Sequence, residues 1–243
     1  MIMALIAYLL FGMAPLNSEI IFWGILSGVL HGVYILCLSR AYSTADISYV
    51  YPIARSAPVF VPVFAWLVLD EHLHISTFLA IGFILTAIYI LHFEGKLIRG
   101  FVNLMRAFRH QDLRWAFYTL AMVVSYSLVD KKGMDSFLSH LPNQPFANGV
   151  TFFFIEAVIG FALCNLYIFS TSPTKYIFQI WRREWHKAML AGIATLGSYG
   201  LICVVLQFEA LSAIVSLRQV SVLMVVYWGC WKLKEPFGLQ RLL

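Results

Sequence analysis

The chain has few charged side chains for its 243 residues. Asp, Glu, Lys and Arg make up 12% of it, whereas hydrophobic residues make up 61%. Soluble domains carry about 25% charged residues, so a fold surrounded by water could not cover this much apolar surface. Apolar runs near the ~20 residues that cross a bilayer recur along the chain. The composition excludes a soluble globular protein and predicts an integral membrane protein.

Motifs for catalysis and metal binding are also lacking. The sequence has no GxSxG nucleophile elbow and no P-loop, so we expect no catalytic residue, no enzyme activity and no cofactor. The four cysteines stand inside apolar runs without CxxC spacing, which is typical of small hydrophobic residues. The turn 70–74 offers Asp, Glu and His side chains, but no further ligand cluster is placed near it, and we predict no metal site.

Apolar runs bounded by polar or turn residues define eight candidate membrane spans. They lie near 1–14, 20–39, 52–69, 75–93, 113–129, 147–169, 188–206 and 212–231. The first run is short, and it lacks the basic region and cleavage site of a signal peptide. The chain stops just where another span could begin. We therefore expect both ends of the chain to be truncated.

Basic residues fall almost entirely on one side of this arrangement. The net charge of +5 would suggest nucleic acid in a soluble protein, but here the basic residues stand in short loops, and we expect no nucleic acid partner. If the eight spans alternate, one side receives thirteen of the seventeen Lys and Arg residues. These are Arg40, Lys96, Arg99, Arg106, Arg109, Arg114, Lys175, Arg182, Arg183, Lys187, Lys232, Lys234 and Arg241. The other side receives only Lys131 and Lys132, so the split supports the span count and indicates that the basic side is cytoplasmic.

The linker 94–112 alternates apolar and basic residues at helical spacing. This pattern predicts an amphipathic helix along the lipid headgroups. Binding of a specific anionic lipid by the linker is the alternative.

Two stretches of the chain match when they are offset by about 163 residues. In both, an acid precedes an arginine by nine residues, and the next glutamate follows sixteen residues later in the first copy and seventeen in the second. The residues are Asp46, Arg55 and Glu71 in the first copy, and Glu209, Arg218 and Glu235 in the second. Because the arginines lie in the third and eighth spans, the copies would cross the membrane in opposite directions. An inverted repeat of this kind predicts alternating access to a site near the midplane.

Short motifs in both halves support a family resemblance. The first half carries Ala41-Tyr42, Ala45-Asp46-Ile47-Ser48, Tyr51-Pro52-Ile53-Ala54-Arg55, Pro58 and Glu71. The second half carries Ser125-Tyr126-Ser127-Leu128-Val129-Asp130-Lys131, Leu217-Arg218-Gln219-Val220-Ser221-Val222 and Lys234-Glu235-Pro236. Together they resemble the two EamA modules of the drug/metabolite transporter superfamily, over nearly the whole chain.

The resemblance implies an all-α membrane protein made of two inverted repeats. Similar family members have ten spans in two modules of five, so this chain would have eight of the ten. The first EamA-like repeat would be 1–93, without its first span, the linker would be 94–112, and the second repeat would be 113–243, without its last span. In relatives with both termini in the cytoplasm, this linker would lie on the extracytoplasmic side of the membrane. The count of basic residues instead indicates that the linker is cytoplasmic, so the orientation of the chain stays open.

Ionisable residues inside the predicted spans are the candidate site residues, because each costs at least ~2.5–3.5 kcal/mol at the bilayer centre unless a partner or water receives it. Arg55 stands between two prolines that would disrupt its helix and free carbonyl groups to line a cavity. Arg218 is its counterpart in the repeat. Together their guanidinium groups could bind a carboxylate or phosphate group of the substrate. The alternative is that each arginine reaches an interface or pairs with an acid.

Other candidates have weaker signals. Glu156 lies inside an apolar run and is a candidate proton-coupling residue, or else a structural partner of an arginine. His31 could face the cavity and bind substrate, although a histidine in helix packing is the simpler interpretation. Substrate could also be bound by tyrosine hydroxyl groups, which are otherwise common in packing and aromatic belts. These are Tyr51, Tyr126 and Tyr199.

Two further features complete the candidate list. Asp130 ends the fifth predicted span, where we expect an exposed residue, although the family motif around it suggests a gating or structural role. Gly28 and Gly32 are spaced for close helix packing.

We therefore hypothesise a secondary transporter in the cell (inner) membrane that moves a small metabolite by alternating access. An amino-acid-like, anionic or zwitterionic solute is the first interpretation. The alternative is a proton-coupled exporter of cationic drugs that uses Glu156. A membrane enzyme or scaffold is a third class, but the sequence offers no motif for it. The expected partners are the solute and the lipid bilayer, and homodimer formation is left open.

Overall fold

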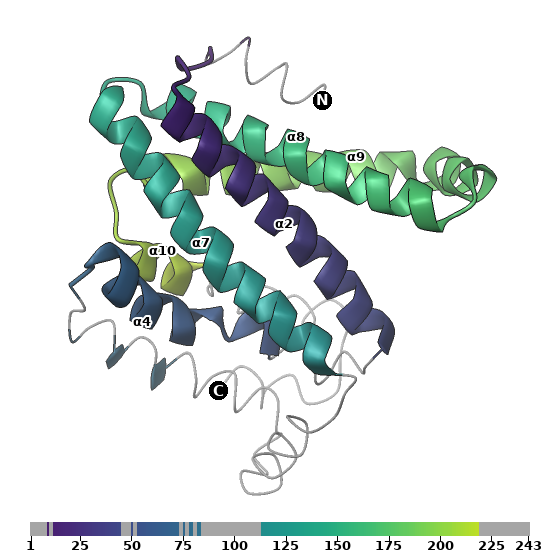
Figure 1. Ribbon diagram of the computed structural model, residues 1–243, viewed down its shortest axis with the longest axis horizontal. Helices are drawn as coiled ribbons and strands as arrows, with labels where there is room; N and C mark the ends of the chain where they lie inside the picture. The colour runs from purple at the N-terminus through teal and green to yellow at the C-terminus, as the bar shows by residue number, and fades with distance from the viewer. Residues whose placement is uncertain are drawn as a thin grey trace, which may run out of the picture. The chain divides into compact units, whose positions relative to one another are not determined.

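The computed structural model describes residues 12–44, 53–72 and 113–218, with the single positions 9, 50, 75, 78, 79, 82 and 83. Within these residues it has six helices (Figure 1). They are α2 (Ser18–Thr44), α4 (Ala57–Leu69), α7 (Arg114–His140), α8 (Pro145–Thr171), α9 (Thr174–Val205) and α10 (Leu211–Leu217). The predicted all-α fold is confirmed for this part of the chain.

Three of these helices, α2, α8 and α9, are long and apolar enough to cross a membrane. Helix α7 has the same length as α2 but carries more charge, and α4 belongs to a shorter apolar helical stretch, Ile53–Leu69. The linker 94–112, most of the spans 1–14 and 75–93 and the chain beyond Arg218 lie outside the described residues. The division into eight spans and two inverted repeats therefore stays a prediction.

Local sequence sets where several helices begin. The side chain of Asn17 caps α2, since its Oδ1 accepts the Ile20 N–H at 2.8 Å. Helix α8 begins at Pro145, which suits a first turn because its missing N–H would have no helical partner there. Pro173 precedes α9, so the chain turns sharply between α8 and α9.

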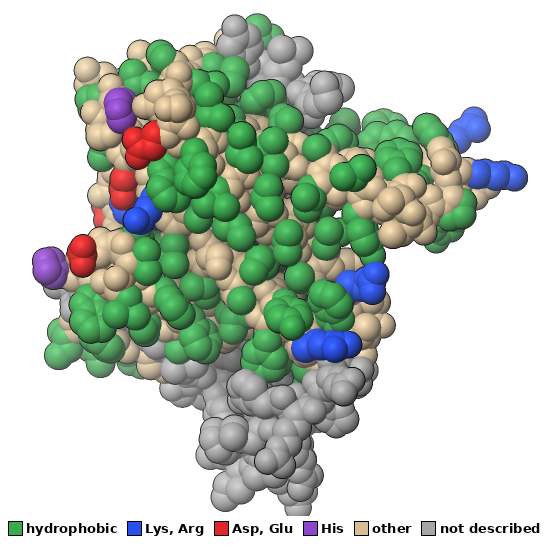
Figure 2. Space-filling model, in the orientation of Figure 1, with side chains coloured by type: hydrophobic (Ala, Val, Ile, Leu, Met, Phe, Trp, Pro, Cys, Tyr) green, Lys and Arg blue, Asp and Glu red, His purple; other side chains and the backbone are tan. Residues whose placement is uncertain are grey.

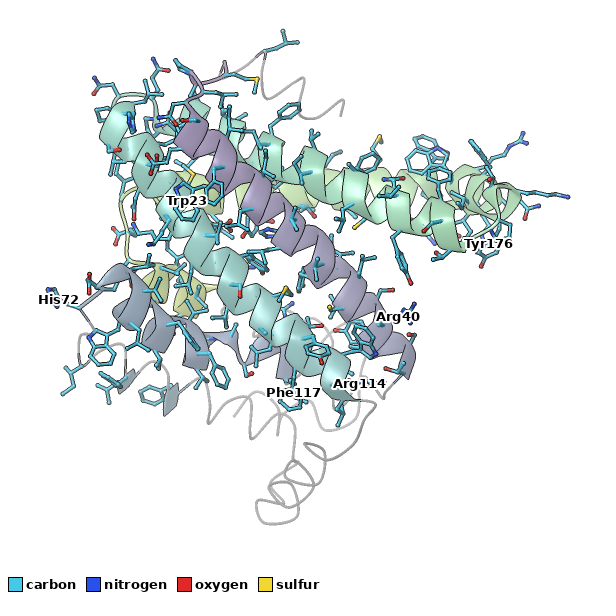
Figure 3. The ribbon with its side chains drawn as sticks, viewed as in Figure 1. Trp23, Arg40, His72, Arg114, Phe117 and Tyr176 are labelled. Carbon is cyan, nitrogen blue, oxygen red and sulfur yellow. The ribbon has the colours of Figure 1, made fainter. Side chains whose placement is uncertain are left out.

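Helix α9 is longer than the span predicted for it. It begins at Thr174 and not near 188, because the basic and aromatic segment before the apolar run is also helical. Lys and Arg side chains gather at the far end of the α8–α9 hairpin, and the exposed Tyr176 lies near it (Figures 2 and 3). Mixed aromatic and basic side chains are typical of a membrane–water interface.

The chain divides into two compact units. The first unit contains residues 1–36 and 125–209, and the second contains residues 37–124 and 210–243. Each unit combines a segment from the first half of the sequence with one from the second. The predicted organisation in sequence order, with repeats at 1–93 and 113–243 around a linker, stays a prediction.

In the first unit, a row of small residues lets α2 pack closely on α8. Gly24, Gly28 and Gly32 follow one another at four-residue intervals and lie on one face of α2. A Cβ atom on Gly28 would lie 2.7 Å from the Cβ atom of Ile159 and 2.8 Å from the carbonyl oxygen of Glu156. The backbones can approach this closely only because these positions have no side chain.

In the second unit, α10 packs against α4. Ser56 interrupts the helical stretch between Arg55 and α4, and α4 ends at Asp70 in a left-handed conformation. The carboxylate of Glu71, just beyond this end, accepts the backbone N–H groups of Leu211 at 2.6 Å and Ser212 at 3.3 Å. One acid from the first half of the sequence thus caps a helix from the second half.

Candidate functional site

Polar side chains from four helices of the first unit meet in one cluster. Two of these helices present a pair of residues on one face, because Ser27 and His31 lie one turn apart on α2 and Tyr126 and Asp130 lie one turn apart on α7. We call this set the buried polar cluster. It consists of Ser27, His31, Tyr126, Asp130, Glu156 and Tyr199.

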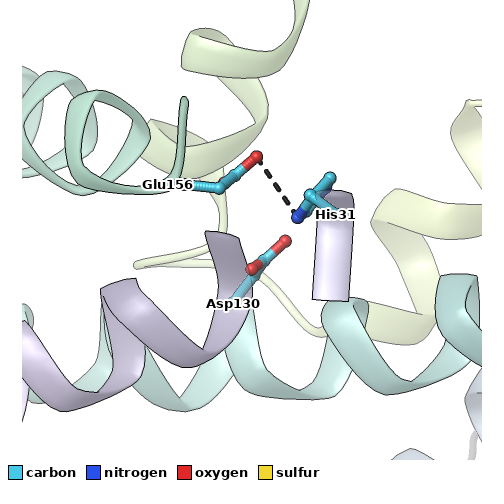
Figure 4. A group of neighbouring side chains, drawn as sticks. All are labelled: His31, Asp130 and Glu156. Atoms are coloured by element: carbon cyan, nitrogen blue, oxygen red, sulfur yellow. Dashed lines mark ion pairs between the residues drawn. The ribbon is translucent and has the colours of Figure 1, made fainter. Parts of the chain in front are cut away.

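An ion pair joins α2 to α8 at the centre of the cluster. Nδ1 of His31 lies 3.3 Å from Oε1 of Glu156 (Figure 4). The side chain of Glu156 is 5% exposed and that of His31 is 14% exposed. A histidine and an acid in apolar helices are each costly alone, so their pairing lowers the free energy of both.

Asp130 provides the second carboxylate of the cluster. It is fully buried, its Oδ1 accepts the hydroxyl of Ser27 and its Oδ2 accepts the hydroxyl of Tyr199, both at 2.5 Å. The prediction of an exposed residue at the end of a span was wrong. Helix α7 continues to His140, past the point where the apolar run ends, so Asp130 lies well inside the helix.

Aromatic rings surround the imidazole. The rings of His31 and Tyr126 stack with centroids 3.8 Å apart, and the ring of Tyr199 meets His31 edge-on at 5.2 Å. The ring centroids of Tyr34 and Tyr126 lie 5.6 Å apart, and those of Phe153 and Tyr199 lie 6.0 Å apart. The rings restrict the orientation of the imidazole and keep the carboxylates in an apolar surrounding.

The charges of the cluster do not balance when both acids are ionised. Among the residues that the structure describes, these two carboxylates lie beside the imidazole of His31, which carries at most one positive charge. Lys131, the next residue after Asp130, is directed elsewhere, since its Nζ donates to the carbonyl of Leu206 and pairs with Asp135, both at 2.8 Å. The cluster is therefore suited to attract a cation.

The structure brings together four of the residues predicted from the sequence, namely His31, Tyr126, Glu156 and Tyr199. The two arginines lie in the other unit, where Arg55 is exposed just before α4 and Arg218 is half-buried at the end of α10. Tyr51 lies outside the described residues. Whether any of these residues binds substrate stays a prediction.

Sequence reasoning missed Ser27 and misjudged Asp130. Ser27 precedes His31 by one helical turn, so helical spacing could have marked it as a neighbour of that histidine. The partners of Asp130 stand 103 and 69 residues away in sequence. No local pattern in a single sequence shows such contacts.

Comparison with known proteins identifies a family for the first part of the chain. Residues 1–93 match the EamA-like transporter family, and no curated protein or solved structure matches the chain. The matched segment includes α2, with Ser27 and His31, and α4. Residues 1–93 are an EamA-like transporter family domain, which places this segment in the drug/metabolite transporter superfamily.

Proposed function

We propose that the chain is a secondary transporter of a small, positively charged solute, which it binds at the buried polar cluster. Family membership implies a membrane transporter and leaves the substrate unspecified. The observation that carries the proposal is the pair of buried acids, Asp130 and Glu156, beside the imidazole of His31. Ionisable groups inside membrane helices most often mark the path of an ion or substrate.

Electrostatics favours a cation over an anion at this site. Bringing an anion next to two carboxylates in an apolar surrounding would add like charges, whereas a cation would offset them. The faces of Tyr126 and Tyr199 add negative potential that also attracts cations. This arrangement supports the alternative drawn from the sequence, a proton-coupled exporter of cationic drugs that uses Glu156.

The pairing of His31 with Glu156 supports exchange of the solute for protons during transport. A carboxylate can hold either a proton or a cationic solute, and binding of one displaces the other. If the site opens alternately to the two sides of the membrane, this competition couples the two fluxes. We propose Glu156 as the coupling residue.

Uptake into proteoliposomes tests the proposal. We expect Glu156→Gln to lower proton-driven uptake of cationic solutes at least 10-fold, because the amide keeps the shape of the side chain and removes its charge. Glu209→Gln is the matched control, because Glu209 is exposed in the same unit. Equal uptake by the wild type and by Glu156→Gln, across a panel of amines and other cations, would contradict the proposal.

A second candidate function uses the arginines of the other unit. Arg55 precedes α4 and Arg218 ends α10, and these two helices pack against each other. Two guanidinium groups on neighbouring elements could bind the carboxylate of an amino-acid-like, anionic or zwitterionic solute. In the same assay, this candidate predicts that Arg218→Ala lowers uptake of such a solute while Glu156→Gln does not.

Long apolar helices and family membership indicate an integral membrane protein. We propose that it crosses the cell (inner) membrane several times. Homodimer formation stays a prediction.

A further inference from the structure

We propose that the buried polar cluster binds a divalent first-row transition-metal ion, with His31, Asp130 and Glu156 as its ligands. The inference that this ion is cargo rests on the proposed transport function. The inference that the ion binds at the cluster does not rest on that function, and it can be tested on the purified protein alone.

The spacing of the three groups fits one metal ion. One ligand atom from each residue lies within 4.8 Å of the other two. Metal–ligand bonds of about 2.0–2.2 Å place two ligand atoms on one ion roughly 3–4.4 Å apart. The 3.3 Å between His31 Nδ1 and Glu156 Oε1 falls inside this range. Small side-chain shifts would bring all three atoms to bonding distance.

The ligand types select the class of metal. Sodium, magnesium and calcium ions prefer oxygen ligands alone, whereas imidazole favours zinc, iron, cobalt and nickel. A site with one imidazole and two carboxylates therefore favours a divalent transition metal. The ion would bring two positive charges to two acids, and the ring nitrogen and carboxylate oxygens that bind it would have to be free of protons.

Neighbouring side chains already hold the ligands in place. The hydroxyl groups of Ser27 and Tyr199 bind the two oxygens of Asp130, and Tyr126 stacks on His31. Such outer contacts orient metal ligands and raise metal affinity. The ligands also come from three different helices, so one ion would link α2, α7 and α8.

The burial of the cluster favours a bare ion over an organic cation. Asp130 is 0% and Glu156 is 4% exposed. An ion needs only the space between three side chains that already lie close together (Figure 4).

Titration of the purified full chain in lipid nanodiscs with Co²⁺ tests this inference, because ligands change the intensity of the visible absorption bands of cobalt. We expect one ion per chain, displaced by Zn²⁺, and at least 10-fold weaker binding in His31→Gln, Asp130→Asn and Glu156→Gln. His140→Gln and Glu209→Gln, at exposed positions of the same unit, are controls that should bind as the wild type does.

A milder variant separates loss of metal binding from loss of folding. Tyr199→Phe keeps all three ligands and removes one hydrogen bond to Asp130, so we expect affinity to fall about 10-fold. Tyr176→Phe, at an exposed position of the same helix, should have no effect.

Absence of cobalt binding by the folded wild type would overturn the inference, as would undiminished binding when all three ligands are replaced. If no metal binds while Glu156→Gln still abolishes uptake of an organic cation, the metal site is overturned and the proposed function stands. If metal binds but is not taken up into proteoliposomes, its role as cargo is overturned.

Discussion

At the scale of single residues, Asp130 shows how a membrane protein accommodates a buried acid. Both oxygens of its carboxylate accept hydroxyl groups, one from Ser27 on α2 and one from Tyr199 on α9. Hydrogen bonds to a charged group contribute about 1.5–3 kcal/mol in soluble proteins, and those within membranes average about 0.6 kcal/mol with a maximum near 1.7. These contacts offset part of the cost of burial.

We expect Tyr199→Phe to lower the free energy of unfolding by about 1–2 kcal/mol, because it removes a donor from a buried carboxylate. Reversible unfolding in bilayers or mixed micelles measures this change. Tyr176→Phe on the same helix is exposed and should leave stability unaltered. Equal effects of the two substitutions would show that the hydroxyl of Tyr199 does not stabilise the fold.

Part of the cluster could be predicted from the sequence. His31 and Glu156 are candidates because ionisable groups in apolar runs are rare. Tyr126 and Tyr199 are candidates because their hydroxyl groups could bind substrate from positions in or beside the spans. The pairing of the residues could not be predicted, since it depends on how four helices pack. Asp130 was misjudged because an apolar run ends at the first charges, whereas a helix continues as long as its backbone hydrogen bonds do.

At the scale of elements, the contact between α2 and α8 positions the site. His31 and the glycines of α2 stand on adjacent faces of that helix, and Glu156 stands on the face of α8 that meets them. The distance between the two backbones therefore sets the distance between the imidazole and the carboxylate. In membranes, where no hydrophobic driving force acts between helices, association depends on van der Waals packing, interhelical hydrogen bonds and lipid entropy, and small residues allow the close packing.

We expect Gly28→Ala to destabilise the protein by about 1–3 kcal/mol, because its Cβ atom would overlap with Ile159 and the backbone of Glu156. It should also weaken binding at the cluster by moving the two helices apart. Thermal unfolding and the cobalt titration measure the two effects.

Gly192→Ala on α9 is the control for that substitution. A Cβ atom there meets nothing within 4 Å, and alanine favours helices by up to ~1 kcal/mol. We expect neutral or increased stability. A loss of stability as large as that of Gly28→Ala would show that the close contact between α2 and α8 is not the cause.

Helices were easier to predict than their ends. The span expected at 147–169 is the helix Pro145–Thr171, but the span expected at 188–206 belongs to a helix that begins at Thr174. Hydropathy predicts which residues lie in the hydrocarbon core, whereas capping of the backbone determines where a helix begins and ends. The predicted span and the helix therefore have the same ends only where a proline or a capping residue lies at the membrane surface. The capping of α10 by Glu71 depends on tertiary contact and had no local signal.

At the scale of the whole molecule, each compact unit takes segments from both halves of the sequence. The polar cluster belongs to one unit and the two arginines belong to the other. The cation and the anion proposals thus assign the solute to different units. Alternating access by two inverted repeats is the mechanism that the sequence predicts for either solute.

The sign of the charge that the protein moves on binding solute tests the central claim most directly. Solid-supported membranes carrying the reconstituted full chain record this charge when a solute is added. At a pH high enough for Glu156 to be ionised before the solute arrives, so that no proton is displaced, we predict a positive charge displacement with cationic solutes, lost in Glu156→Gln and retained in Arg218→Ala. Currents that arise only with anionic solutes, and that Arg218→Ala abolishes while Glu156→Gln does not, would contradict the account.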